Sequence, residues 1–194
     1  MKELKQSGKA VTIGLSNFMA PDLLRLGKEI HSFCINQVPY NILEREYEGK
    51  TRDICLKNRI SYMAYSPTAQ GLLAGRLSSE ALNFPARKWN KLYQEPLFTK
   101  SKPVRDTINN IAEEINTKPI AVALAWVLEQ KNILTAIVGS RKAAQVPEFA
   151  AAGSLLEASI DIQLTELGTE GLVSDDLVHD MRQLAMVRNL QGNP

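Results

Sequence analysis

The sequence predicts an α/β fold built on a parallel sheet. Short apolar runs rich in β-branched residues alternate along the chain with stretches whose apolar residues recur every three or four positions. The short runs are apolar at successive positions, which is typical of strands covered on both faces, and a helical stretch follows each of them. With 194 residues, 44% of them hydrophobic, the chain is long enough to bury a core as one domain.

Four strands and five main helical regions follow from this pattern. The strands are expected at Val11 to Leu15, Ile35 to Val38, Tyr62 to Tyr65 and Thr135 to Val138. Helices are expected at Pro21 to Ile30, Glu46 to Asn58, residues 104–115, Lys118 to Gln130 with Thr117 as N-cap, and Ala143 to Ala152. The long segment from Ala69 to Lys102 lacks a regular pattern, and a loop of that length usually has a function or moves.

Composition and charge limit the partners that we expect. There are 23 Lys and Arg against 21 Asp and Glu, without a basic cluster, so a nucleic-acid partner is not indicated. The longest apolar run, Ile120 to Leu128, is far shorter than the ~20 residues that cross a bilayer, so we expect no membrane contact and a cytoplasmic location. Cys34 and Cys55 lack a second ligand at metal-binding spacing and are interpreted as free thiols, and no metal site is expected.

Polar residues gather where the predicted strands end, which is where parallel α/β sheets bind ligands. The amide of Gln37 could pair with a carboxamide, and the ring of Tyr65 could stack on a heterocycle or belong to the core. Gly139-Ser140-Arg141 opens a helix and offers backbone N–H groups and a guanidinium to a phosphate. Ser16 and Asn17 are equally compatible with capping the next helix.

Two further observations narrow the chemistry. Arg76 is either a second phosphate contact or a solvated surface residue. The sequence contains neither of the common glycine-rich nucleotide motifs and no readable pairing of a nucleophile with a base, so no catalytic residue is predicted.

Five motifs in order closely resemble the aldo-keto reductases. They are GKAVTIGLSNF from Gly8, NQVPYNILERE from Asn36, AYSPTAQGLLAGRL from Ala64, ALAWVLEQ from Ala123 and AIVGSRKAAQV from Ala136. The resemblance covers about residues 1–152 and implies a TIM-type (β/α)8 barrel that binds NADP(H) and reduces aldehydes or ketones. Because the motifs match the family from about its fifth strand onward, the resemblance implies a parallel (βα)4 half of such a barrel, its carboxyl-terminal, NADP-binding half.

The resemblance assigns cofactor contacts residue by residue. Ser16, Asn17 and Gln37 match the groups that hold the nicotinamide carboxamide, and Tyr65 matches the ring beneath the nicotinamide. The positions that match the pyrophosphate segment are Ser66, Thr68, Gly71, Leu72 and Arg76. The positions near the 2′-phosphate and the adenine are Gly139, Ser140, Arg141, Gln145 and Glu148, and Phe149 stands where the family usually has Asn.

The resemblance also implies what the chain lacks. The family's catalytic Asp, Tyr, Lys and His lie upstream of the Ser-Asn-Phe motif, which here begins sixteen residues from Met1, so we expect the chain to be inactive alone. The alternative function is a non-catalytic NADP-binding or interaction module. An open half barrel exposes edge strands, so we expect a homo-oligomer or a separate amino-terminal half as partner, and a small carbonyl substrate only when the barrel is completed. Residues 153–194 are expected to form an inserted loop and a last helix.

Overall fold

The computed structural model describes residues 1–75, 77, 87 and 89–157. Four strands form one parallel sheet in the order β1-β2-β3-β4, so each strand pairs with the next one in the sequence. The strands are β1 (Gly14–Ser16), β2 (Ile35–Pro39), β3 (Ser61–Tyr65) and β4 (Ile133–Ile137). The predicted parallel α/β architecture is therefore confirmed for this part of the chain.

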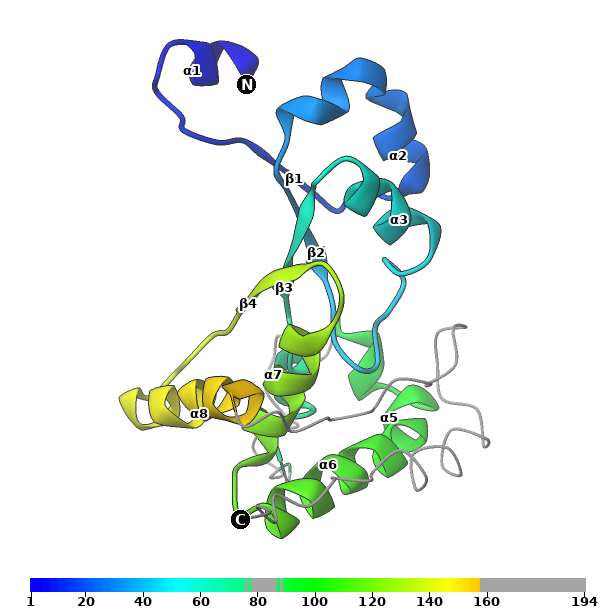
Figure 1. Ribbon diagram of the computed structural model, residues 1–194. Helices are drawn as coiled ribbons and strands as arrows, with labels where there is room; N and C mark the ends of the chain where they lie inside the picture. The colour runs from blue at the N-terminus through cyan, green and yellow to red at the C-terminus, as the bar shows by residue number, and fades with distance from the viewer. Residues whose placement is uncertain (76, 78–86, 88, 158–194) are drawn as a thin grey trace, which may run out of the picture.

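Helices connect the strands and follow the last one (Figure 1). The α-helices are α1 (Lys2–Gln6), α2 (Ala20–Arg25), α3 (Lys50–Lys57), α5 (Leu97–Lys100), α6 (Lys102–Glu114), α7 (Pro119–Glu129) and α8 (Val146–Glu157). Short 3-10 helices are η1 (Gly27–Ser32), η2 (Ala69–Gly71), η4 (Lys91–Tyr93) and η5 (Ala143–Gln145). Helix α1 buries none of its residues and stands apart from the other helices in Figure 1.

Helix α7 forms the centre of the core. Its residues from Ile120 to Val127 are all buried, because the helix packs on α6, α8 and β4. Helix α6 is amphipathic and buries one face, with Val104, Ile108, Ile111 and Ala112. The predicted burial of the Lys118 to Gln130 region is therefore confirmed.

One face of the sheet is buried, and in β2 and β3 the other face is half-buried. Burial alternates along β2 and β3, because successive side chains of a strand point to opposite faces. Val38 and Ala64 lie on the buried face, whereas Gln37 and Tyr65 lie on the half-buried face. The half-buried face also carries the apolar side chain of Met63.

Two predicted elements begin later than expected. Strand β1 begins at Gly14 and pairs with β2 over only three positions, while Val11 remains 89% exposed, so an apolar β-branched run is not by itself a strand. Helix α3 begins at Lys50, because Gly49 precedes it with a φ of 57°, and residues 46–48 form a loop. The predicted starts at Val11 and Glu46 were therefore wrong.

Three other boundaries also differ from the prediction. The helix expected from Pro21 to Ile30 divides at Gly27, whose φ is 51°, into α2 and η1. Thr117 is not an N-cap, because Lys118 holds that position and makes no side-chain capping bond. Helix α8 continues past Ala152 to Glu157, and the rest of the expected inserted loop and last helix, residues 158–194, lies outside the described residues.

Candidate functional site

A cavity of about 570 Å³ lies beyond the carboxyl ends of β3 and β4, and we call it the β4 cavity. Its walls come from the segment after β3, the turn after β4 and the start of α8, with Arg87 and Ile120 completing them. The predicted cofactor residues that line it are Ser66, Thr68, Gly71, Gly139, Ser140, Arg141 and Gln145. The fold thus brings together two sequence segments that were predicted separately to bind phosphate.

Hydrogen bonds within the turn after β4 fix its conformation. The side-chain oxygen Oε1 of Gln145 accepts hydrogen bonds from the backbone N–H groups of Arg141 and Lys142, at 2.9 and 3.1 Å. The hydroxyl of Ser140 donates to the backbone oxygen of Lys142 at 2.8 Å. A side chain added at Gly139 would meet no atom within 4 Å, so the backbone there is open to a ligand. These bonds fix the turn beside the cavity and leave Ser140 and Arg141 exposed to solvent.

The segment after β3 approaches the cavity through an unusual backbone. Ser66, Ala69, Gln70 and Gly71 all have positive φ, at 51°, 50°, 56° and 94°. The guanidinium of Arg87 covers Gly71 so closely that a Cβ there would lie 2.8 Å from Nη2. Only glycine fits this position without displacing Arg87.

A second cavity of about 320 Å³, the β2 cavity, adjoins the first. It is lined by Pro39, Glu44, Tyr65 and the segment from Trp89 to Lys91, and it shares Ser66 and Gln70 with the β4 cavity. Tyr65, the predicted ring partner of the nicotinamide, therefore lines the β2 cavity and not the β4 cavity.

The strand ends bring Asn17, Gln37 and Tyr65 together as predicted. The hydroxyl of Tyr65 donates to Oδ1 of Asn17 at 3.1 Å, and the backbone N–H of Asn17 donates to the backbone oxygen of Gln37 at 2.9 Å. Ser16 pairs in register with Gln37 and is exposed. The amide of Gln37 donates to the sulfur of Met63 at 3.5 Å, which is a weak partner for a group with this hydrogen-bonding capacity.

Five of the predicted cofactor residues that the structure describes line neither cavity: Ser16, Asn17, Gln37, Leu72 and Glu148. Leu72 is fully buried in the core and does not line either cavity, so its side chain is not available to a ligand. Glu148 is half-buried on α8 and also does not line them, whereas its neighbour Phe149 lines the β4 cavity. Arg76 lies outside the described residues.

Sequence reasoning missed Arg87, Tyr93 and Asn41, which contact the segment after β3 from distant positions. Arg87 donates to the backbone oxygen of Gln70 from Nε and Nη2, at 3.3 and 3.1 Å, and the hydroxyl of Tyr93 donates to the same oxygen at 3.1 Å. Nδ2 of Asn41 donates to the backbone oxygen of Ser66 at 3.0 Å. Arg87 and Tyr93 lie outside the five motifs, and Asn41 lies within NQVPYNILERE, where nothing local indicates its contact with Ser66.

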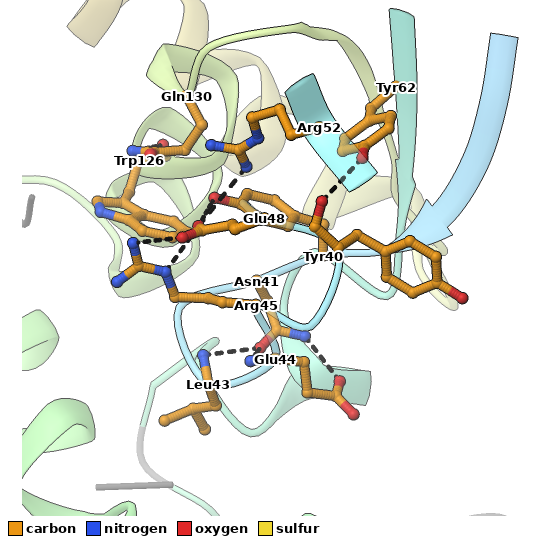
Figure 2. A network of polar contacts seen from close by, with 11 residues as sticks. Tyr40, Asn41, Leu43, Glu44, Arg45, Glu48, Arg52, Tyr62, Trp126 and Gln130 are labelled. Carbon is orange, nitrogen blue, oxygen red and sulfur yellow. Dashed lines mark hydrogen bonds and ion pairs between the residues drawn. The ribbon is translucent and has the colours of Figure 1, made fainter. Parts of the chain in front are cut away.

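Polar side chains around Glu48 form a second cluster, which we call the buried network (Figure 2). Glu48 accepts two hydrogen bonds from Arg45, at 2.7 and 2.9 Å, and one from the hydroxyl of Tyr40 at 2.5 Å. Arg52 lies 3.5 Å from the same carboxylate, with its guanidinium 5.0 Å from the centre of the Tyr40 ring. Burial favours a raised pKa for Glu48, but the bonds from Arg45 and Tyr40 and the nearby charges outweigh it and hold the pKa below its ordinary value. Tyr40 also stacks on Trp126.

The described residues do not contain a group of three or more His, Cys, Asp or Glu side chains that could hold a metal ion. Cys34 and Cys55 are free thiols, and Cys55 is fully buried. In the same part of the chain, the helices are too short or too polar to cross a membrane.

Comparisons with known proteins agree with this architecture. Residues 1–162 match the model of the aldo/keto reductase family. The chain is 30% identical over 145 residues to probable aldo-keto reductase 1 of Glycine max, covering 73% of this chain and 41% of that protein. It is 28% identical over 172 residues to the NADH-specific methylglyoxal reductase of Escherichia coli, covering 89% and 52%.

A solved structure shows the same fold. The glycerol dehydrogenase of Gluconobacter oxydans superposes with a TM-score of 0.68 at 24% identity, over 99% of this chain and 55% of that one. The chain spans about half the length of the curated relatives that it matches. With a family match over residues 1–162 and a parallel sheet whose strand ends carry the motif residues, the chain belongs to the aldo/keto reductase family.

Proposed function

We propose that this chain is the cofactor-binding half of an aldo-keto reductase-type oxidoreductase, a (βα)4 half barrel that corresponds to the carboxyl-terminal part of the family's fold and binds NADP(H). The observation that carries the proposal is the β4 cavity, where the turn after β4 and the segment after β3 present phosphate-binding groups to the same space. When bound, the nicotinamide would supply or accept a hydride at a carbonyl carbon.

The phosphate end of the proposed site rests on Ser140 and Arg141. The groups that we propose for the phosphate are the open backbone at Gly139, the Ser140 hydroxyl and the Arg141 guanidinium. A guanidinium can bind the 2′-phosphate of NADP(H) with two parallel hydrogen bonds, so these residues favour NADP(H) over NAD(H). Because the Escherichia coli relative is described as NADH-specific, the affinities for NADPH and NADH are to be compared directly.

The nicotinamide end of the proposed site rests on Gln37 and Tyr65. Both lie on the half-buried face of the sheet, and the β2 cavity beside Tyr65 adjoins the β4 cavity through Ser66 and Gln70. A flat ring and a carboxamide-matching amide suit a nicotinamide, with Ser16 and Asn17 at the same strand ends. A dinucleotide lying across Ser66 and Gln70 would reach both cavities.

We assign no acid–base catalyst to the described residues. The hydroxyl of Tyr65 already donates to Asn17, at the edge where the cofactor ring would stack. We propose that a complementary set of strands supplies the acid that reduction of a small aldehyde or ketone requires, so that this chain alone has no appreciable turnover. The alternative is a non-catalytic module that binds NADP or another protein and does not take part in turnover.

The edges of the sheet suit such a partner. Strands β1 and β4 each pair on one side only among the described strands, and β4 exposes Leu134 and Ile137 to 63% and 40%. Open parallel edges with apolar side chains associate with other strands. We propose either a second copy of this chain or a separate amino-terminal half as the occupant.

Calorimetric titration of the 194-residue chain with NADPH, with NADH and with NADPH against Arg141→Ala tests the proposal. We expect micromolar binding of NADPH that weakens about tenfold or more when either the 2′-phosphate or the Arg141 guanidinium is absent, because a charge-assisted pair contributes about 1.5–3 kcal/mol. Lys142→Ala is the matched control, because it removes a neighbouring cation that does not line the cavity.

Equal affinity of the Arg141→Ala and unaltered chains would contradict the assigned phosphate contact, and absence of binding to the folded chain would refute the cofactor site. Light scattering on the same samples measures the association state. A monomer at micromolar concentration, with or without NADPH, would rule out the second copy as partner and leave the separate half.

A further inference from the structure

The two residues that line both cavities are also the two whose carbonyl oxygens are held from outside the loop. Ser66 and Gln70 each border the β2 and β4 cavities. The Ser66 oxygen accepts from Asn41, and the Gln70 oxygen accepts from Arg87 and Tyr93. The segment between the cavities is thus tied down at each of its ends.

Asn41 is fully engaged and fully buried. Its Oδ1 accepts from the backbone N–H groups of Leu43 and Glu44, at 2.9 and 3.0 Å. Its Nδ2 donates to the Glu44 carboxylate at 2.9 Å and to the Ser66 oxygen at 3.0 Å. An amide has two donor and two acceptor positions, so Asn41 has no alternative orientation that preserves these bonds. Figure 2 shows Asn41 at the lower edge of the buried network, bonded to Leu43 and Glu44.

The Gln70 oxygen is held by three donors. Arg87, whose exposure is 9%, contributes Nε and Nη2, and Tyr93 contributes its hydroxyl. Burial raises the pKa of Tyr93 against the opposing influence of Arg87 and other arginines, so the phenol remains protonated and continues to donate at neutral pH. Tyr93 is itself fixed by stacking on Phe98, with ring centres 6.4 Å apart.

The held segment has a backbone that the sequence does not favour. Ser66, Ala69 and Gln70 adopt positive φ without being glycine, and each such residue costs free energy relative to the ordinary right-handed region. External hydrogen bonds at both ends offset that cost and keep the segment in one conformation. In this conformation Ser66 and Gln70 line both cavities.

Resting on the proposed cofactor site, we propose that Asn41 and Tyr93, together with Arg87, are positioning residues that hold Ser66 and Gln70 ready for the dinucleotide. Asn41 and Tyr93 line neither cavity and act through the two backbone oxygens, whereas Arg87 also lines the β4 cavity. A preorganised loop does not have to be ordered when the ligand binds, so these residues raise cofactor affinity.

Two matched pairs of variants test this proposal. Tyr93→Phe removes a hydroxyl that donates to a backbone oxygen beside the cavities, and Tyr62→Phe removes one that donates to the Tyr47 oxygen at 2.8 Å in the core. Asn41→Asp removes the donor to Ser66 at the carboxyl end of β3. Asn132→Asp removes the donor to Ile60, at 3.0 Å, before the start of the same strand.

For each chain we would measure the NADPH dissociation constant by calorimetry, the urea midpoint of unfolding, and amide hydrogen exchange over residues 66–75. Tyr93→Phe is expected to raise the dissociation constant about threefold to tenfold and to speed exchange in this segment, with little change in midpoint. Asn41→Asp is expected to raise it about tenfold or more. Tyr62→Phe and Asn132→Asp are expected to lower the midpoint and leave the dissociation constant within about twofold.

The outcomes separate this inference from the function on which it rests. Absence of NADPH and NADH binding by the unaltered chain would overturn the cofactor site and its positioning together. Binding by the unaltered chain that Tyr93→Phe leaves unchanged, with exchange over residues 66–75 also unchanged, would overturn the positioning alone. If Asn41→Asp does not fold, the Tyr93→Phe and Tyr62→Phe pair decides the matter.

Discussion

Two polar regions of this chain use the same side-chain chemistry in opposite ways. In the buried network, the Glu48 carboxylate is bonded by Arg45 and Tyr40 and pairs with Arg52, each of these side chains being largely enclosed. At the rim of the β4 cavity, Ser140 and Arg141 are exposed and border an open space. The polar side chains of the network bond to one another, whereas those of Ser140 and Arg141 at the rim are exposed beside the cavity.

This difference separates stability from binding. A charge that is buried with its partners contributes to a unique packing and becomes costly when one partner is removed. A polar group beside a cavity contributes little to folding, because water satisfies it until a ligand arrives. Variants in the network should therefore change unfolding and leave cofactor affinity alone, and variants at the rim should do the reverse.

The largest effect is expected from Glu48→Gln. The substitution removes the negative charge that faces Arg45 and Arg52, whose side chains are 15% and 12% exposed, and leaves two enclosed cations without their counterion. Breaking such a pair costs about 3–5 kcal/mol, which would be measured as a lower urea midpoint. NADPH affinity of the fraction that remains folded should not change.

Glu46→Gln is the matched control, because Glu46 and its partner Lys91 are 56% and 52% exposed and such surface pairs contribute about 1 kcal/mol or less. The acid range gives a second check. Because the pKa of Glu48 is lower in the folded protein, its contribution is present above the ordinary carboxyl pKa and is lost as the pH falls through the lowered value. Equal acid sensitivity of the unaltered and Glu48→Gln chains would contradict this account.

Gly71→Ala should have an intermediate effect that appears in both measurements. Alanine at a φ of 94° is strained by about 1–2 kcal/mol, and its Cβ would displace Nη2 of Arg87 from the Gln70 oxygen. We expect NADPH binding to weaken about tenfold and the midpoint of thermal unfolding to fall by about 2–8 °C.

Gly49→Ala supplies the comparison for backbone strain alone, because its φ is 57° and a Cβ there meets no atom within 4 Å. It should lower the thermal midpoint without weakening NADPH binding. If both glycine variants bind NADPH as the unaltered chain does, the contact between Gly71 and Arg87 has no bearing on the site.

The sequence predicted the parts of the site that are local. Gly139-Ser140-Arg141 lies next to its strand and its helix, so strand order and a helix start were enough to locate it at the rim. The positions of Asn17 and Tyr65 followed from the same rule for parallel sheets, and their hydrogen bond agrees with it. Helices α6 and α7 were also predictable, because α6 has apolar residues at helical spacing and α7 is a continuous apolar run of helical length.

The parts that were not predicted depend on contacts between distant residues. Arg87 reaches Gln70 across 17 residues and Asn41 reaches Ser66 across 25, and neither contact has a signal in its own neighbourhood. Residues 46–48 were predicted as helix because the spacing of Tyr47 and Thr51 is helical. They form a loop instead, in which Glu48 bonds to Arg45 and Tyr40. These short-range hydrogen bonds and the positive φ of Gly49 accompany the loop in place of the helix.

The smallest effect is expected from Gln145→Ala. The Gln145 side-chain oxygen accepts hydrogen bonds from the backbone N–H groups of Arg141 and Lys142. Without it these N–H groups bond to water, and the turn after β4 is no longer held in one conformation. Loss of a comparable helix-start bond costs about 0.5–1 kcal/mol, so NADPH binding should weaken about twofold to fivefold. Gln130→Ala is the control, because it removes a bond to the Trp126 oxygen at the end of α7, away from both cavities. If calorimetry finds the same NADPH affinity for Gln145→Ala, Gln130→Ala and the unaltered chain, the hydrogen bonds within the rim do not contribute to binding. The rim would then function without bonds among its own groups, unlike the buried network.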